Sequence, residues 1–272
     1  MTIDSLERPN QCVRMLNCVQ EYWRGQAVRD ALTQIRAGPD GERYFGGNEW
    51  LQFWIDEAQR VLAPGYTPTA ADMLKLRRPT SGVVELAFTM TPDDGGNTGA
   101  QDFVLVDVGG QTHEMKSWEG QLNAPGLCGI VFMANLAGFA RRGERRESRL
   151  LDDLALLDKC LAAFPAMQAL PIAVMLNKRD LFEAALEKGP AKGKFHHYVK
   201  ECPRDVAKGS RGGILKWLAG EVEKGNEGAF VSADHGAITC FASCATDTDQ
   251  AQDMIDQVFD AILTNQVQNS LM

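Results

Sequence analysis

Several features that define other classes of protein are missing from this 272-residue sequence. It has no apolar run near the roughly 20 residues of a transmembrane helix, and Met1–Asp4 does not begin a signal peptide. Its seven cysteines include no C-x-x-C pair and no zinc-site spacing, which favours the reduced, buried thiols of a cytosolic protein. The net charge of -8 argues against nucleic-acid binding. We therefore expect a cytoplasmic protein that has no nucleic acid as a partner.

Stretches with helical spacing alternate along the chain with stretches that have the spacing of strands. Residues 11–63 have helical spacing up to Pro64-Gly65. Further along, the pattern predicts strands at 83–90, 103–108, 127–134, 170–176 and 238–245, and helices at 144–164, 214–222 and 251–263. The first two strands form a hairpin through the loop 92–100, whereas 183–230 is otherwise poorly patterned. The alternation predicts an α/β fold, a doubly wound and mostly parallel sheet with helices on both faces.

The segment Asp107-Val108-Gly109-Gly110-Gln111 ends one of these apolar strands. Its carboxylate can reach a metal through water, and its second glycine leaves a backbone N–H free to approach an oxyanion. Its glutamine can orient an attacking water. The alternative is an ordinary tight turn. The segment indicates a phosphate site if the rest of the chain supports one.

Two further polar segments follow predicted strands, at the edge where doubly wound sheets bind ligands. Residues 177–180 read Asn-Lys-Arg-Asp, and the carboxylate of Asp180 suits the two N–H donors of a guanine base. Lys178 would cover the purine face and Asn177 would tie the loops together. Residues 243–245 would direct a backbone N–H at the guanine oxygen. The alternatives are a charged loop with Asp180 as a helix N-cap, and small residues packing at a strand end.

A basic segment, Leu74-Lys75-Leu76-Arg77-Arg78-Pro79-Thr80, lies upstream of these strands. The hydroxyl of Thr80 is a suitable Mg²⁺ ligand, and Arg77, three residues earlier, can reach a transferring phosphoryl group. A solvated basic linker is the alternative interpretation.

Together, these ordered motifs resemble the α subunit of heterotrimeric G proteins. Residues 72–85 resemble the first switch of that family, 107–111 the second switch, and 177–180 and 244–248 its two base-recognition loops. The last predicted helix resembles the one whose end meets receptors. The resemblance implies a Ras-like GTPase domain at 67–272, preceded by part of an all-α helical domain at 1–66.

The resemblance also implies a function, a site and partners. The chain would be a guanine nucleotide-binding signalling switch that binds GTP/GDP and Mg²⁺, hydrolyses GTP and couples receptors to effectors. Gln111 and Arg77 would be catalytic, and Thr80 would bind the metal. The implied nucleotide contacts are Leu74, Lys75, Leu76, Arg77, Arg78, Pro79, Thr80, Asp107, Val108, Gly109, Gly110, Gln111, Asn177, Lys178, Arg179, Asp180 and Ala245. A βγ dimer, a G-protein-coupled receptor at the C-terminal helix and a downstream effector would be partners, at the cytoplasmic face of a membrane.

The family's phosphate-binding loop, G-x-x-x-x-G-K-[ST], is absent from the sequence. Gly189–Lys194 differs from it in spacing, and Phe195 stands in place of the hydroxyl residue. The first strand, central in the family's sheet, is also expected to be missing, so the strands at 103–108 and 127–134 would face a gap or pair with each other. An N-terminally truncated chain or a degenerate paralogue is expected. The alternative function is a non-hydrolysing interaction module that keeps the partner surfaces and binds nucleotide weakly.

Overall fold

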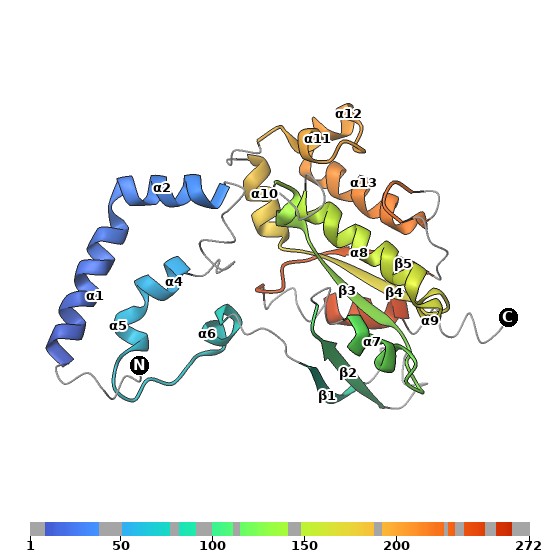
Figure 1. Ribbon diagram of the computed structural model, residues 1–272, viewed down its shortest axis with the longest axis horizontal. Coiled ribbons are helices and arrows are strands. Elements are labelled where there is room, and N and C mark those ends of the chain that lie inside the picture. Colours follow the sequence, from blue (N-terminus) through green and yellow to red (C-terminus); the bar gives the residue numbers. More distant parts are fainter. Residues whose placement is uncertain are drawn as a thin grey trace. The chain divides into compact units, whose positions relative to one another are not determined.

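The computed structural model describes most of the chain and divides it into two compact units (Figure 1). The described residues are 9–37, 51–76, 82–90, 100–110, 115–140, 148–187, 192–225, 228–231, 237–247 and 254–262. Unit 1 comprises Met1–Arg78 and unit 2 comprises Pro79–Met272. None of the helices within these described ranges is both long and apolar enough to cross a bilayer.

Every regular element described in unit 1 is a helix, which the spacing predicts for residues 11–63 but not for the last helix at 70–75. The helices are α1 (Pro9–Arg24), α2 (Gln26–Ala37), α4 (Leu51–Asp56), α5 (Ala58–Val61) and α6 (Ala70–Lys75). The helical stretch ends before Pro64-Gly65, where Gly65 has a φ of 77°, a left-handed conformation that favours glycine. Unit 1 continues to Arg78, beyond the boundary expected after residue 66. The assignment of the units to a helical and a GTPase domain stays a prediction.

Amide side chains connect helix α1 to the short helices α4 and α5. Gln20, which is 6% exposed, donates from Nε2 to the Ile55 carbonyl oxygen at 2.7 Å. Gln59 donates from Nε2 to Asn17 Oδ1 at 2.7 Å. Both bonds join residues far apart in sequence, so α1 is fastened to α4 and α5 by directed polar contacts.

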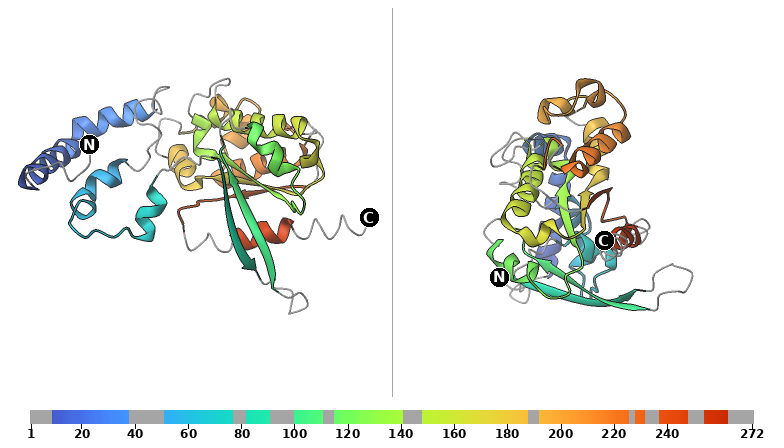
Figure 2. Two further views of the ribbon diagram at one scale, coloured as in Figure 1. Left: turned by 60° about the horizontal axis from the view of Figure 1, so that its bottom comes forward. Right: turned by 90° about the vertical axis from the view of Figure 1, so that its right-hand side faces the viewer.

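A β-hairpin begins the described part of unit 2, as predicted. β1 (Val83–Met90) pairs antiparallel with β2 (Gln101–Val108), so that Phe88 lies opposite Phe103. These two rings stack at 5.8 Å between centroids, and each also contacts Phe259 of the C-terminal helix, residues 254–262. In both views of Figure 2 the hairpin runs out from the rest of unit 2. Its aromatic contacts with Phe259 hold the loop-side half of the hairpin to that helix.

The remaining strands form a parallel sheet in the order β3-β4-β5. They are β3 (Ile130–Asn135), β4 (Ile172–Asn177) and β5 (Ile238–Ala242). Because side chains alternate along a strand, Val174 and Leu176 of β4 join the core cluster that contains α8 (Arg149–Ala163) and α13 (Arg211–Glu223). Ala173 and Met175 instead pack against Val258 and Ile262 of the C-terminal helix. A parallel sheet with helices on both faces is thus confirmed for three of the predicted strands, whereas β1 and β2 form a separate antiparallel sheet.

Short helices fill the connections of unit 2. They are α7 (Met115–Leu122), η3 (Leu136–Ala140, a 3-10 helix), α9 (Pro165–Gln168), α10 (Arg179–Glu187), α11 (Phe195–Tyr198) and α12 (Arg204–Ala207). Within the poorly patterned stretch 183–230, the helix predicted at 214–222 is confirmed as part of α13, whereas α11 and α12 were not predicted. Phe182 of α10 and Phe195 of α11 are fully buried and pack their rings at 5.9 Å. The four-residue helices α9, α11 and α12 each bury one residue, namely Met167, Phe195 and Ala207, and are too short for a periodic pattern to appear in the sequence.

The described strands belong to two separate sheets, so β2 and β3 do not pair with each other. Large apolar side chains are exposed on both strands, namely Val104, Leu105, Val131 and Met133. Of the two expected outcomes, pairing of these strands with each other is not found among the described residues, and the missing central strand stays a prediction.

No disulfide joins the six cysteines whose side chains the structure describes, which are Cys18, Cys128, Cys160, Cys202, Cys240 and Cys244. Cys160 and Cys202 are buried, and burial raises the pKa of each thiol to about 11, which keeps both protonated and unreactive at neutral pH. Cys18 is exposed, so the expectation of buried thiols is wrong for this residue.

Candidate functional site

The carboxyl ends of β4 and β5 bring two of the predicted segments together. The parallel register pairs Leu176 with Ala242, so residue 177 and residue 243 leave the sheet side by side. Ser243 donates its N–H to the Leu176 carbonyl at 2.9 Å, and Arg179 donates its N–H to the Ser243 carbonyl at 2.9 Å. The ladder therefore continues past the strand ends and holds the two loops at one edge of the sheet.

The side chain of Asn177 joins these two loops, as its sequence position predicts. Its Oδ1 accepts hydrogen bonds from the N–H of Lys178 at 2.8 Å, the N–H of Ala245 at 3.0 Å and the hydroxyl of Ser243 at 3.4 Å. Ser243 is only 3% exposed. We call this set of contacts the Asn177 bridge. The Ala245 N–H, predicted to meet a guanine oxygen, is used by Asn177 in this conformation.

Asp180 lies just beyond the bridge with an exposed side chain. Lys178 has a φ of 65°, the left-handed conformation that residues other than glycine seldom adopt. This turn starts α10 at Arg179, so Asp180 lies in the first turn of the helix and not at the position before it. The interpretation of Asp180 as an N-cap is therefore wrong. A carboxylate in the first turn of a helix is stabilised by the positive end of the helix dipole and remains exposed to a ligand.

The end of β2 presents two glycines with different surroundings. Gly109 is buried, and its carbonyl oxygen accepts a hydrogen bond from Trp118 Nε1 at 2.9 Å. Gly110 is exposed, and a Cβ at this position would meet no atom within 4 Å. Packing among the described residues does not explain a glycine at 110. Close approach of a ligand to its backbone is the explanation that the sequence predicts. Asp107 is exposed on the same strand.

The predicted catalytic and metal-binding residues fall mainly outside the described residues. Arg77, Arg78, Pro79, Thr80 and Gln111 belong to this group. Leu74 and Lys75 lie in α6 and Leu76 is its C-cap, all within unit 1. Within the described ranges, no group of three or more His, Cys, Asp or Glu side chains could hold a metal ion. The structure thus brings together the predicted base-recognition segments, and the roles of the remaining residues stay predictions.

One polar network was not predicted as a functional feature, although its sequence contains a signal for it. Thr69 and Asp72 form a reciprocal capping box at the start of α6, with the Thr69 hydroxyl bonded to the Asp72 N–H at 3.2 Å. A threonine followed by an acidic residue three positions later is the pattern that announces such a box. Arg60 and Tyr66 add to it, and no short motif indicates their participation.

Comparison with known proteins identifies the family. The family model described as G-protein alpha subunit matches residues 4–262. The chain belongs to the G-protein alpha subunit family. It is 27% identical over 261 residues to a guanine nucleotide-binding protein G(o) subunit alpha of Locusta migratoria, in a match that covers 92% of the chain and 63% of that relative. The chain thus spans less than two thirds of the length of this G-protein alpha subunit.

Membership makes the chain a relative of G-protein signalling switches. G-protein alpha subunits are GTPases built from a Ras-like domain and a helical domain, and they bind guanine nucleotides with Mg²⁺. The helical unit 1 and the α/β unit 2 agree with that architecture. The Asn177 bridge lies at the strand ends where such a domain binds its ligand.

Proposed function

We propose that the chain is a guanine nucleotide-binding signalling switch that hydrolyses GTP to GDP. The observation that carries the proposal is the Asn177 bridge, which holds the Lys178–Asp180 loop and the Ala245 loop together at the ends of adjacent parallel strands. Two loops fixed to each other form a preorganised site, and preorganisation lowers the cost of ordering when a ligand binds.

Recognition of the base would depend on Asp180. Its exposed carboxylate is a double acceptor suited to the ring N–H and the exocyclic amine of guanine, which adenine does not offer in this arrangement. The stem of Lys178 would lie over the purine face, and the Ala245 N–H would move from Asn177 Oδ1 to the guanine oxygen. That exchange would replace one hydrogen bond of the Ala245 N–H by another, and the Ser243 hydroxyl would still join the two loops through Asn177 Oδ1.

Recognition and hydrolysis at the terminal phosphate would depend on the two switch segments. The open backbone at Gly110 supports close approach of a phosphate oxygen. Gln111 would position the attacking water, and Arg77 would stabilise the charge that develops on the transferred group. Thr80 would hold Mg²⁺, which when bound neutralises negative charge on the phosphate oxygens.

The sequence contains no G-x-x-x-x-G-K-[ST] loop, so these residues address only the base and the terminal phosphate. Each charge-assisted hydrogen bond that such a loop provides is worth roughly 1.5–3 kcal/mol. We therefore expect nucleotide affinity well below that of an alpha subunit that carries the loop.

Partners would follow the family pattern of a βγ dimer, a receptor and an effector. The C-terminal helix uses Val258 and Ile262 to cover the sheet, which leaves its other side, where Asp256, Gln257 and Asp260 are exposed, for a receptor. The segment 109–118, which includes the start of α7, would be the surface that changes with the nucleotide.

Titration of the purified chain with fluorescent GTP, ATP and xanthosine triphosphate analogues in Mg²⁺, together with phosphate release, tests the proposal. Asp180→Asn should weaken the binding of GTP and strengthen the binding of the xanthine nucleotide. Xanthine has a carbonyl in place of the guanine amine, and the amide N–H₂ of asparagine can donate to it. Gln111→Leu should abolish turnover and leave binding in place. Asp205→Asn, an exposed aspartate in α12, is the matched control and should change neither.

Absence of GTP binding at hundreds of micromolar would overturn the proposal for this chain. The interaction module without hydrolysis would then be the remaining function. Equal affinity for GTP and ATP would also contradict it, because the role given to Asp180 requires discrimination between the two bases.

A further inference from the structure

An open hollow lies where α12 meets α13 on the surface of unit 2. Its volume is about 400 Å³, which is within the range of ligand pockets. Its lining is largely apolar and includes Val206, Gly209, Gly213, Trp217 and Gly220. Figure 1 and the right-hand view of Figure 2 place α12 and α13 at the end of unit 2 opposite the β1–β2 hairpin. None of the lining residues belongs to the Asn177 bridge, so the α12–α13 hollow is a separate surface.

The sequence of α13 explains the hollow. The helix buries one side, formed by Ile214, Leu215, Leu218 and Val222. Gly213, Trp217 and Gly220 follow one another at spacings of four and three residues, so they share another side of the helix. Trp217 packs edge-on against Phe230, with 5.7 Å between the ring centroids, and this contact fixes the wall of the hollow. The glycines before and after this tryptophan leave the space beside it open.

Gly220 has no explanation within unit 2. It lies inside α13, where glycine makes a helix less stable than alanine does. Its backbone is not in the left-handed conformation, and a Cβ at this position would meet no atom within 4 Å. Packing among the described residues therefore does not require glycine here, whereas close approach of another molecule to the helix backbone would.

The hollow lies in a basic part of an acidic chain. The whole chain has a net charge of -8, yet residues 188–224 contain nine lysines and arginines against four acidic residues. Lys216 and Lys224 line the hollow, and both are exposed. A segment whose charge opposes the net charge of the chain favours a negatively charged partner.

Two donors at the hollow are unused. No described residue forms an ion pair or a hydrogen bond with the Lys216 ammonium, and none accepts from the Trp217 indole N–H. The carboxylate of Glu221, which also lines the hollow, accepts from Lys224 Nζ at 2.5 Å and from the Ala229 N–H at 3.1 Å. Because Glu221 is engaged, the hollow combines an apolar floor with donors for a partner that carries acceptors.

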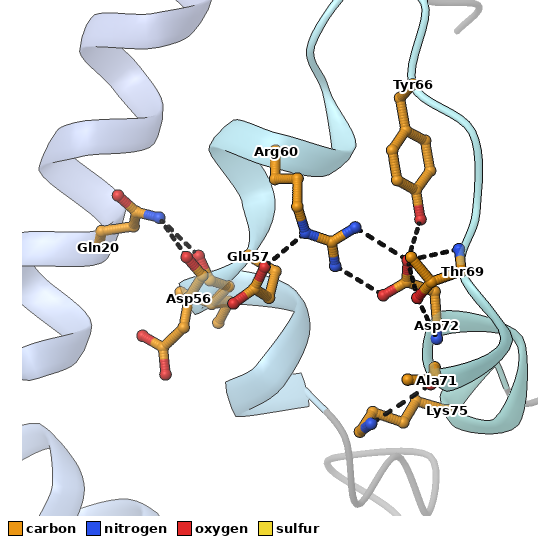
Figure 3. A network of polar contacts seen from close by, with 10 residues as sticks. Gln20, Asp56, Glu57, Arg60, Tyr66, Thr69, Ala71, Asp72 and Lys75 are labelled. Carbon is orange, nitrogen blue, oxygen red and sulfur yellow. Dashed lines mark hydrogen bonds and ion pairs between the residues drawn. The ribbon is translucent and has the colours of Figure 1, made fainter.

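Asp72 of unit 1 shows the opposite case, a charged group that the chain satisfies completely (Figure 3). It is 2% exposed and accepts from the Arg60 guanidinium at 2.9 and 2.6 Å and from the Tyr66 hydroxyl at 2.9 Å. Thr69 donates to it from its N–H at 2.9 Å and from its hydroxyl at 2.8 Å. A carboxylate has about four acceptor positions, so Asp72 has none left for a ligand and serves to stabilise unit 1.

We propose that the α12–α13 hollow docks an acidic polypeptide segment that inserts one large apolar side chain. The apolar floor beside Trp217 would receive this side chain, and Gly220 would allow the backbone of the segment to approach α13. Lys216 would meet a carboxylate at the rim, where charge sets orientation and the rate of association. A hollow suits a projecting side chain better than the flat surface of a bilayer does. The inference does not depend on nucleotide binding, so it fails or holds separately from the proposed function.

Fluorescence anisotropy with labelled synthetic peptides tests the kind of partner. The probe is a short peptide of glutamates with one central phenylalanine, compared with the same peptide carrying a central serine and with a lysine peptide carrying the phenylalanine. The acidic phenylalanine peptide should bind roughly tenfold or more tightly than the serine peptide, because it buries an aromatic ring. The lysine peptide should not bind, and added salt should weaken the acidic peptides by screening the rim charges.

Variants of α13 test the place of binding. Gly220→Gln fills the hollow with a better helix former, so it should weaken the phenylalanine peptide by roughly tenfold or more without lowering the thermal stability. Gly212→Gln is the matched control, because it lies in the same helix, has open space at its Cβ and does not line the hollow. Lys216→Glu should weaken the acidic peptides, and Lys159→Glu, at an exposed lysine of α8, should not.

Four results would overturn the inference. They are absence of peptide binding at millimolar concentration, equal affinity for the phenylalanine and serine peptides, unchanged affinity in Gly220→Gln, and equal losses in Gly220→Gln and Gly212→Gln. Binding to phosphatidylserine vesicles without binding to the acidic peptide would assign the basic segment to a membrane and would also contradict the proposal. Self-association that Gly220→Gln abolishes, in the absence of peptide binding, would assign the hollow to a second copy of the chain instead.

Discussion

Unit 1 and unit 2 are stabilised by different interactions. Among the residues of unit 1 whose burial is described, 17–31 and 53–76, the buried side chains are Gln20, Ala58 and Asp72. In unit 2, helix α8 alone buries six apolar residues, which are Leu150, Leu151, Leu154, Leu157, Cys160 and Leu161. Unit 1 therefore depends on directed polar contacts, and unit 2 depends on the removal of apolar surface from water.

The difference determines how each unit responds to change. Apolar burial has no direction but requires close packing, whereas a hydrogen-bonded carboxylate also needs donors at the right distance and angle. A unit held by polar contacts is also sensitive to pH. Local stability within one chain is therefore expected to vary with the kind of contact as well as with its amount.

The largest effect is expected in the core of unit 2. Leu157→Ala removes a fully buried side chain of α8 and should cost about 2–5 kcal/mol of unfolding free energy, from lost burial and the cavity left behind. Hydrogen exchange resolved by peptide should show the loss in unit 2 and not in unit 1. Leu86→Ala, at a side chain that is 60% exposed, is the control and should change stability by no more than about 0.5 kcal/mol. An equal loss in both units would contradict the comparison.

A smaller effect, confined to unit 1, is expected from acid. The Arg60 guanidinium and then the Thr69 amide hold the pKa of Asp72 well below its usual range. A carboxyl whose pKa is lower in the folded chain than in the unfolded chain stabilises the fold at any pH above its unfolded pKa, which is roughly 3.9. That contribution is lost as the pH falls toward the folded value. The wild type should thus exceed Asp72→Asn in thermal stability at pH 7, and the advantage should shrink below roughly pH 4.

Thermal unfolding followed by circular dichroism from pH 7 to pH 3 measures this advantage. Asp205→Asn, at an exposed aspartate of unit 2, is the matched control. An advantage that stays constant down to pH 3 would assign the stabilising effect of Asp72 to packing and not to its charge.

The smallest effect is expected at an exposed ion pair of unit 2. Arg211 Nη1 lies 3.1 Å from Glu187 Oε2, and the two side chains are 46% and 54% exposed. Exposed pairs are worth about 0–1 kcal/mol, so Glu187→Gln should leave urea unfolding almost unchanged. The Arg60–Asp72 pair has a similar length but a buried carboxylate. If Glu187→Gln and Asp72→Asn lowered the free energy of unfolding equally, burial would not explain the stability that the polar contacts of unit 1 provide.

Much of unit 2 follows from its sequence. The apolar strands and the amphipathic α8 were predicted because burial imposes a period of two or of 3.6 residues. The role of Asn177 as a connection between loops was predicted from its place at a strand end, and the contacts with Lys178 and Ala245 confirm it. These features are local, or depend on the general rule for where parallel strands end.

Contacts between distant residues were not predictable in the same way. The bidentate bond from Arg60 to Asp72 depends on the angle between two short helices, which no local pattern records. The left-handed Lys178 starts α10 one residue before Asp180, a shift that sequence alone did not show. Trp118 reaches the Gly109 carbonyl only because α7 folds back on the end of β2.

The position of β4 has a consequence for how the chain is made. β4 ends at Asn177, and its neighbour β5 begins only at Ile238. The ribosome releases the chain from its N-terminus at roughly 5–20 residues per second, so β4 waits several seconds for this neighbour. The β1–β2 hairpin joins residues close in sequence and can close at once. A strand with five buried residues thus keeps one edge unpaired during translation, which makes the nascent chain the form of this protein most prone to aggregation.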